Sequence, residues 1–197
     1  MAYIGMRYPV ASKIATESAG SEPTYGTGFV VGKAISANLT ITRNDNPLYA
    51  DDAIAEEDNG ITAMSIEVGT DDLDESVQEN LLGVKKDATG TPILYFDTDA
   101  AAPYVGFGYI RVRRLNGATK FQAIWMHKVQ FGQTSETAQT KGESIEWQTP
   151  TITGRAMGVS LNSPAAISFR KRAVFETEAA AKTWLNTQAN ISSQTTT

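Results

Sequence analysis

Two β-forming runs separated by Asn116-Gly117 constrain the fold more than any other feature of this sequence. The runs are Y-V-G-F-G-Y-I-R-V-R-R and T-K-F-Q-A-I-W-M-H-K-V-Q-F, and the Asn-Gly dipeptide accepts the positive φ values of a two-residue hairpin turn. Such a turn sets the register and places small residues opposite large rings. The expected pairs are Val112–Phe121, Ile110–Ala123, Gly108–Trp125, Gly106–His127 and Tyr104–Val129, with Phe107–Met126 and Tyr109–Ile124 on the other face. Both faces are apolar over the middle of the hairpin, so we expect a second sheet or another subunit to cover them.

Alternation with a period of two predicts further strands on both sides of this hairpin. The predicted strands contain Ile35, Ala37, Leu39 and Ile41; then Met64, Ile66 and Val68; then residues from about Ile145 to Ile152, with a bulge or an edge at Pro150; and finally residues from about Ile167 to Phe175. The first 30 residues show no sustained period and predict an irregular N-terminal arm.

Two short helices complete the prediction. The first is capped by Thr70 or Asp71, buries Leu73, Val77 and Leu81, and stops at Gly83. The second is capped by Thr177 and turns Ala180, Ala181, Trp184 and Leu185 inward. The expected fold class is therefore mainly β, a β-sandwich or barrel with one short flanking helix and a C-terminal short helix. We expect a single domain over residues 1–188 and a polar tail over residues 189–197.

Composition excludes several classes of function. The chain has no cysteine, which rules out disulfides, thiolate zinc sites and cysteine nucleophiles. Its net charge of -5 argues against nucleic-acid binding as the main role, because phosphate-binding surfaces need clustered Lys and Arg. No apolar run approaches the roughly 18 residues of a membrane span, and the first residues do not resemble a signal peptide, so we expect synthesis and folding in the cytosol.

The connection between the first and second of these predicted strands, residues 43–60, is long and strongly acidic. Asp51, Asp52, Glu56, Glu57 and Asp58 fall within eight consecutive residues without a cation. Their spacing does not match a calcium loop, and a glycosidase pair requires a separation that one clustered loop does not specify. The remaining interpretation is a solvated or partner-facing loop that its own charge keeps extended.

Other candidate sites favour ordinary structural roles. His127 is the only histidine and lies on a strand face with Trp125 and Val129. The sequence has no G-x-S-x-G motif that would supply a nucleophilic serine for this histidine to activate. The stretch G-T-G-F-V-V-G lacks the Lys-Ser/Thr of a phosphate loop. Two basic groups, Arg170-Lys171-Arg172 and Arg111, Arg113 and Arg114, are either solvated or in contact with the acidic loop of a neighbouring copy.

Several motifs in order give a more specific indication. They are Y-I-G-M-R-Y-P-V-A, N-P-L-Y-A-D-D, D-N-G-I-T, A-P-Y-V-G-F-G-Y and K-G-E-S-I-E-W-Q-T-P-T-I-T-G. From about Ala2 to Leu185 the chain closely resembles the major tail proteins, the tail-tube subunits of long-tailed bacteriophages that infect Gram-positive bacteria.

The resemblance implies a structural virion protein, a β-sandwich subunit that self-assembles into stacked hexameric rings and forms a hollow tail tube for DNA delivery. It implies no catalytic residue, metal or cofactor. The implied partners are other copies of the chain, a tape-measure protein, and tail terminator and distal tail proteins, while phage DNA crosses the lumen without specific binding. Residues 43–60 would then contact the adjacent ring, with Leu48, Tyr49 and Ile54 as apolar anchors among the acids and with Arg170, Lys171 and Arg172 as candidate basic contacts.

Two alternatives remain open at this stage. One is a monomeric β-sandwich module of a phage virion that binds a carbohydrate or a receptor. The other is a hydrolase that uses two of the loop acids.

Overall fold

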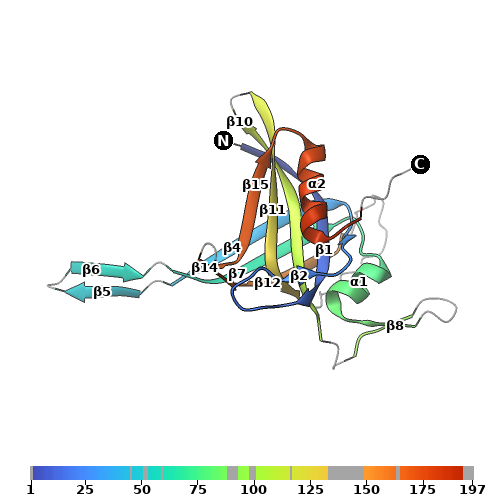
Figure 1. The fold of residues 1–197 in the computed structure, drawn as a ribbon, viewed down its shortest axis with the longest axis horizontal. Coiled ribbons are helices and arrows are strands. Elements are labelled where there is room, and N and C mark those ends of the chain that lie inside the picture. Colours follow the sequence, from blue (N-terminus) through green and yellow to red (C-terminus); the bar gives the residue numbers. More distant parts are fainter. Residues whose placement is uncertain are drawn as a thin grey trace, which may run out of the picture.

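A computed structural model describes residues 2–44, 46–50, 53–58, 60–87, 93–97, 101–115, 117–132, 149–162 and 165–192. The fold is mainly β, as the sequence predicts, and two helices accompany the strands in these ranges. In chain order (Figure 1) the elements are β1 (Ala2–Thr16), β2 (Thr24–Tyr25), β3 (Phe29–Val30), β4 (Ala34–Arg43), β5 (Asn46–Ala50), β6 (Ala53–Asp58), β7 (Ile61–Thr70), α1 (Glu75–Leu82), β8 (Lys85–Asp87), β9 (Ile93–Tyr95), β10 (Tyr104–Leu115), β11 (Ala118–Phe131), β12 (Thr151–Met157), β13 (Val159–Asn162), β14 (Ala165–Ser168), β15 (Arg170–Phe175) and α2 (Glu178–Ala189).

One large antiparallel sheet organises the molecule. Its strands follow the order β2-β1-β10-β11-β12-β7-β4, with β15 beside β11 and β3 beside β1. The long strand β11 changes partner along its length, because residues 121–126 pair with β15 and residues 128–131 pair with β12. At the far end of the order β4 comes to lie near β1. The sheet therefore curls back on itself in a barrel-like manner, and in Figure 1 β4 and β7 run across the direction of β10 and β11.

The hairpin β10–β11 has the predicted register near its turn and a different one farther away. Gly108 pairs with Trp125 and Ile110 with Ala123, as expected, and the predicted pairs of the opposite face also form. Farther from the turn than Phe107, the predicted pairs Gly106–His127 and Tyr104–Val129 are wrong. There Val105 pairs with Val129, and Tyr104 pairs with Gln130. An extra residue on β11 causes this shift. It lies where β11 changes partner, and a bulge supplies the bend that such a change requires.

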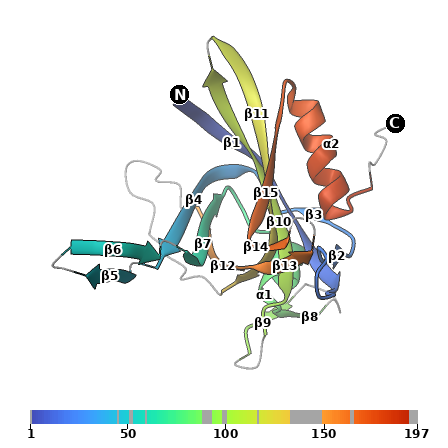
Figure 2. The ribbon, with the colours of Figure 1, turned by 60° about the vertical axis from the view of Figure 1, so that its left-hand side comes forward.

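Two hydrophobic clusters cover the two faces of this hairpin. The first lies inside the curled sheet, where Phe107, Tyr109 and Phe131 pack with β7, β12 and α1. The second contains Trp125 and Ile110 and is covered by one side of α2, which lies along the sheet in Figure 2. The expectation that a second sheet or another subunit covers this face is thus wrong. An amphipathic helix of the same chain provides the cover.

Both helices form where the sequence predicts them, but one cap and some of the buried residues differ from the prediction. The N-cap of helix α1 is Asp74, whose side chain accepts a hydrogen bond from the Ser76 amide, and its C-cap is Gly83 in the left-handed conformation with φ 70°. Thr70 belongs to β7, and Asp71 instead accepts a hydrogen bond from the Lys33 amide at 2.8 Å, so neither is the cap.

Helix α2 has the predicted Thr177 cap. Ala181 and Leu185 are buried as expected and Ala189 joins them, whereas Trp184 is half-buried and Ala180 is exposed. A spacing of four residues keeps the three buried positions on one side of the helix.

The N-terminal segment is the largest departure from the sequence-based prediction. Residues 2–16 form β1, a 15-residue strand between β2 and β10, where an irregular arm was expected. Its pairing with β10 shifts between Tyr3 and Gly5 and again between Arg7 and Val10, and Tyr8 adopts a positive φ of 55°. These interruptions remove the simple alternation by which a strand is recognised.

Three smaller predictions also change. The strand expected from about Ile145 begins at Thr151, while residues 145–148 lie outside the described ranges. The strand expected over 167–175 is divided into β14 and β15. Ile35 is exposed because a register shift between Ala34 and Ser36 turns it outward.

Candidate functional site

The acidic connection between β4 and β7 contains a two-stranded hairpin, β5–β6. Its base is closed by a hydrogen bond of 2.7 Å from the Asn44 amide to the Gly60 carbonyl. Both ribbon views show the hairpin projecting away from the body of the molecule (Figures 1 and 2). An isolated two-stranded hairpin is marginally stable in water. In the part of the chain that the structure describes, β5 and β6 pair with each other and with no other strand.

The register of the hairpin places the predicted contact residues along its two strands. Tyr49 lies opposite Ile54, Leu48 opposite Glu56, Pro47 opposite Glu57 and Asn46 opposite Asp58. Asp51 and Asp52 follow β5 in the sequence and lie outside the described residues. The roles assigned to these acids and apolar anchors remain predictions.

The basic sequence Arg170-Lys171-Arg172 is divided between two faces of the sheet. In β15 Lys171 lies opposite Trp125, on the face that α2 covers, whereas Arg170 and Arg172 lie opposite Met126 and Ile124 on the other face. Lys171 forms an ion pair with Glu22, which belongs to the segment between β1 and β2. Lys171 is therefore engaged within its own chain. Arg170 and Arg172 have no ion pair among the residues that the structure describes.

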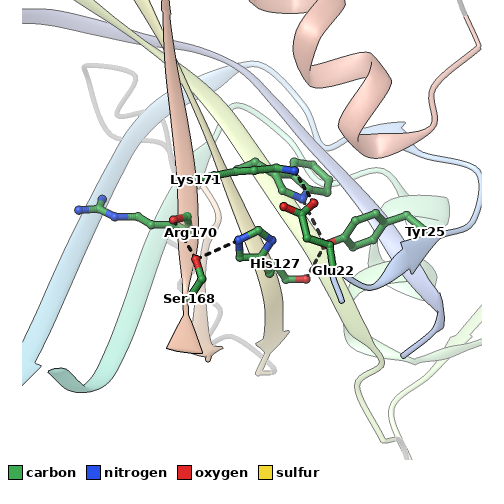
Figure 3. A network of polar contacts seen from close by, with 7 residues as sticks. Glu22, Tyr25, His127, Ser168, Arg170 and Lys171 are labelled. Atoms are coloured by element: carbon green, nitrogen blue, oxygen red, sulfur yellow. Dashed lines mark hydrogen bonds and ion pairs between the residues drawn. The ribbon is translucent and has the colours of Figure 1, made fainter. Parts of the chain in front are cut away.

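A network of polar contacts surrounds Lys171 (Figure 3). The Tyr25 hydroxyl donates to the backbone carbonyl of His127 at 2.9 Å and accepts from the Trp125 indole nitrogen at 3.2 Å. Burial raises the pKa of Tyr25 well above its ordinary value, and the indole donor opposes that shift. The hydroxyl therefore stays protonated and serves as both donor and acceptor. These two hydrogen bonds connect β2 to β11 at the centre of the sheet.

His127 is buried and lies close to Ser168. The distance between His127 Nε2 and Ser168 Oγ is 3.2 Å, which is within the range of a serine–histidine pair. Nucleophilic catalysis also needs a group that orients the histidine, but His127 Nδ1 is buried and has no hydrogen-bond partner within the described ranges. Burial lowers the pKa of His127. The contact of this enclosed imidazole with Ser168 links β11 to β14.

A cleft of about 720 Å³ lies where β4, β7, β11 and β12 meet the end of α1. Its lining combines apolar side chains with polar ones: Thr42, Ala63, Met64, Ser65, Leu82, Asp97, Ala102, Gln130, Phe131, Gly132, Thr153, Gly154 and Arg155. The volume is in the range of small-ligand sites. Nothing in the sequence pattern indicates this cleft, since it depends on strands distant in the chain.

Three further observations bear on function. Where side chains are described, no three His, Asp or Glu residues converge in a way that would hold a metal ion. No helix in the same ranges is long and apolar enough to cross a membrane. A scan against protein-family models and a search of curated proteins find no match to this chain.

Sequence reasoning missed the pairing of Glu22 with Lys171 and the separation of Lys171 from its neighbours. The period of two in a strand provides a signal for the separation, because adjacent residues point to opposite faces. The ion pair joins residues that are distant in the sequence, so no local signal could have shown it.

Proposed function

We propose that the chain is a tail-tube subunit of a long-tailed bacteriophage, which assembles into hexameric rings and stacks them into a hollow tube in the virion. The observation that carries the proposal is the acidic hairpin β5–β6, which projects from a mainly β body at the position where the resemblance implies an inter-ring contact. The ordered sequence motifs supply the family expectation.

The proposed partners follow from the same expectation. They are neighbouring copies of the chain, which make the ring and the axial stack, a tape-measure protein, and tail terminator and distal tail proteins. DNA crosses the lumen during ejection without specific binding.

Electron microscopy of the purified protein tests this function. A tube subunit forms rings or tubes about ten nanometres wide, on the order of a few domain diameters. A variant in which residues 46–58 are replaced by a short Gly-Ser linker should keep the circular dichroism and melting temperature of the body but form no tubes. A protein that stays monomeric at every concentration and salt condition would contradict the proposal.

A monomeric binding module for a carbohydrate or a receptor is a second candidate, because the cleft has the volume of a ligand site. Arg155 and Gln130 supply polar groups at its wall, and Phe131 supplies an apolar one. Glycan binding by a monodisperse monomer, abolished by Arg155→Ala, would favour this function over the tube.

A further inference from the structure

Two basic sequences that are distant in the chain meet on one face of the sheet. In one row of the sheet, Tyr109 of β10 lies opposite Ile124 of β11, which lies opposite Arg172 of β15. In the next row, Phe107 lies opposite Met126, which lies opposite Arg170. Residues in one row point to the same side of the sheet, and so do residues two apart in a strand. This face, which we call the basic face, therefore carries Arg111, Arg113, Lys120, Arg170 and Arg172.

The side chains of this face converge as the register implies. Burial raises the pKa of the Tyr109 hydroxyl, and the charges of Arg111 and Arg170 act to lower it, so both guanidinium groups lie within electrostatic range of one phenol. The Arg111 guanidinium also lies 3.8 Å from the centre of the Tyr3 ring. Arg111 and Arg170, one from each basic sequence, thus lie near the same tyrosine.

The basic face lacks anionic partners in its own strands. Strands β1, β10, β11 and β15 contain no Asp or Glu. Of the five cations only Lys120 has an ion pair in the described structure, with Glu176, and Arg113 Nε is buried there without an acceptor. Exposed apolar groups lie beside them, since Tyr3 is 50% and Val174 is 45% exposed. A ligand for this face needs closely spaced anions and some apolar surface.

We infer that the basic face receives the acidic hairpin β5–β6 of a second copy of this chain. The inference rests on the proposed function and identifies the surface that the hairpin contacts. The hairpin strands carry Glu56, Glu57 and Asp58 together with Leu48, Tyr49 and Ile54, which match the cations and the exposed apolar groups in chemical type.

The contact joins two copies, because a chain's own hairpin projects away from its body (Figures 1 and 2). A contact between two different patches is heterologous, so it repeats from copy to copy and builds rings or stacks. A nucleic acid is the other polyanion that a basic surface binds, but the net charge of -5 opposes its approach to this chain.

Disulfide cross-linking tests the contact directly, because the chain has no cysteine of its own. Arg172→Cys is combined with Glu56→Cys in one variant and with Glu57→Cys in another, since neighbours in a strand point to opposite sides. We expect at least one combination to form disulfide-linked dimers and longer multimers on mild oxidation. In the control, Arg114→Cys replaces Arg172→Cys; Arg114 is exposed and lies next to Arg113 on β10, so it faces the opposite side. The control should give little cross-linked product.

A second experiment reverses the charges on each side of the proposed contact. Arg170→Glu with Arg172→Glu, and separately Glu56→Lys with Glu57→Lys, should each weaken self-association about tenfold or more, because like charges then meet across the contact. A mixture of the two variants should associate again, while Arg114→Glu should behave as the original chain. Sedimentation measures association, circular dichroism checks the fold, and microscopy scores tubes.

The outcomes separate the two proposals. Tubes that form without hairpin-to-face cross-links, or that tolerate the Arg170 and Arg172 reversals, would overturn the inference and leave the tube function standing. Specific cross-linked multimers without tubes would support the contact and contradict the tube. Binding of a mixed-sequence DNA duplex that is lost with the Arg→Glu changes, with no cross-link to the hairpin, would assign the face to a nucleic acid instead.

Discussion

Trp125 fills space that two glycines of the neighbouring strand leave open. A Cβ on Gly106 would lie 2.3 Å from Trp125 Cζ2, and one on Gly108 would lie 2.6 Å from Trp125 Cε3. The Tyr25 ring meets the indole edge to face with 5.1 Å between their centroids. Because the indole is fully buried between the sheet and α2, these glycines are required for packing.

We predict that Gly108→Leu prevents normal folding of the subunit. Its side chain would meet Trp125, Leu185 Cδ2 at 2.8 Å and the Ile124 carbonyl at 2.9 Å, and such overpacking costs about 1–3 kcal/mol or more. Thermal and urea unfolding measure the loss. Gly5→Leu is the control, since a Cβ at Gly5 meets nothing within 4 Å. An unchanged melting temperature for Gly108→Leu would show that the register around Trp125 is wrong.

The burial of His127 leads to a prediction of how the free energy of unfolding depends on pH. Burial lowers its pKa below the ordinary value of 6.5, so the unfolded chain takes up a proton at a higher pH than the folded chain. The free energy of unfolding should therefore fall as pH drops below about 6.5, until the pH reaches the pKa in the folded state.

Urea unfolding between pH 7.5 and 5.5 checks this expectation. His127 is the only histidine in the chain. The pKa values of the Asp71, Asp74 and Glu178 carboxylates are lowered, so these groups change protonation below this pH range. His127→Gln should be less stable at every pH but should lose most of the slope. An equal slope in both proteins would count against a buried, neutral imidazole.

At the scale of elements, α2 acts as the cover of one sheet face. It buries Ala181, Leu185 and Ala189 against Trp125 and Ile110. Its first turn is tied to β1, because Glu178 forms ion pairs with Arg7 at 2.5 Å and, four residues along the helix, with Lys182 at 2.9 Å. Tyr8 of β1 also donates to Asn186 at 2.9 Å. These polar contacts lie at the rim and position the helix, while the apolar stripe supplies most of the stabilisation.

Leu185→Ala should lower the free energy of unfolding by about 2–5 kcal/mol, because it leaves a cavity at a fully buried position. Urea unfolding of the monomer measures the change. Thr183→Ala, on the exposed side of the same helix, should change stability by less than about 0.5 kcal/mol. If the two variants were equally stable, the helix would not cover the sheet as described.

At the scale of the whole molecule, charge is strongly separated. The strands of the basic face contain no acid, while the hairpin region concentrates five acids in eight residues. Opposite charges on different surfaces of one chain favour ordered association between copies and make it sensitive to salt. Net charge alone, at -5, does not reveal this arrangement.

Replacing Asp51, Asp52, Glu56 and Glu57 together by Ser should leave the monomer folded but weaken the stacking of rings. Circular dichroism and tube length by microscopy are measured together, at low and at high salt. The pair Glu56→Ser with Glu57→Ser is also tested alone, and Glu75→Ser with Glu79→Ser, two acids of α1, is the charge-matched control for this pair. Tubes of normal length under both salt conditions would show that the charge of the hairpin does not matter for stacking.

In an assembled ring we expect the channel wall to be neutral or acidic. A row of cations facing the channel would bind DNA phosphates, and sixfold symmetry would repeat each one around the ring. Arg170 and Arg172 should therefore lie in contacts between copies or on the outside, as Lys171 already lies in a contact within the chain. A ring structure determined by electron microscopy checks this expectation, and a channel lined by these arginines would contradict it.

The sequence by itself determined the features that depend on neighbouring residues. The Asn-Gly turn and the alternation around it established the hairpin β10–β11 and the pairs near Trp125, because turn chemistry and cross-strand packing act over a short span. The Thr177 cap and the Gly83 stop followed from local hydrogen bonding and backbone freedom. The concentration of acids between β4 and β7 was also visible without a structure.

Tertiary structure decided the rest, because it depends on pairing between distant strands. Strand β1 acquires its place from β10 despite two register shifts, and the bulge in β11 reflects its change of partner from β15 to β12. Only the pairing of β15 with β11 places Arg170 and Arg172 beside Arg111 and turns Lys171 to the opposite face. A local pattern specifies which residues alternate, but the register of the whole sheet determines which of them share a surface.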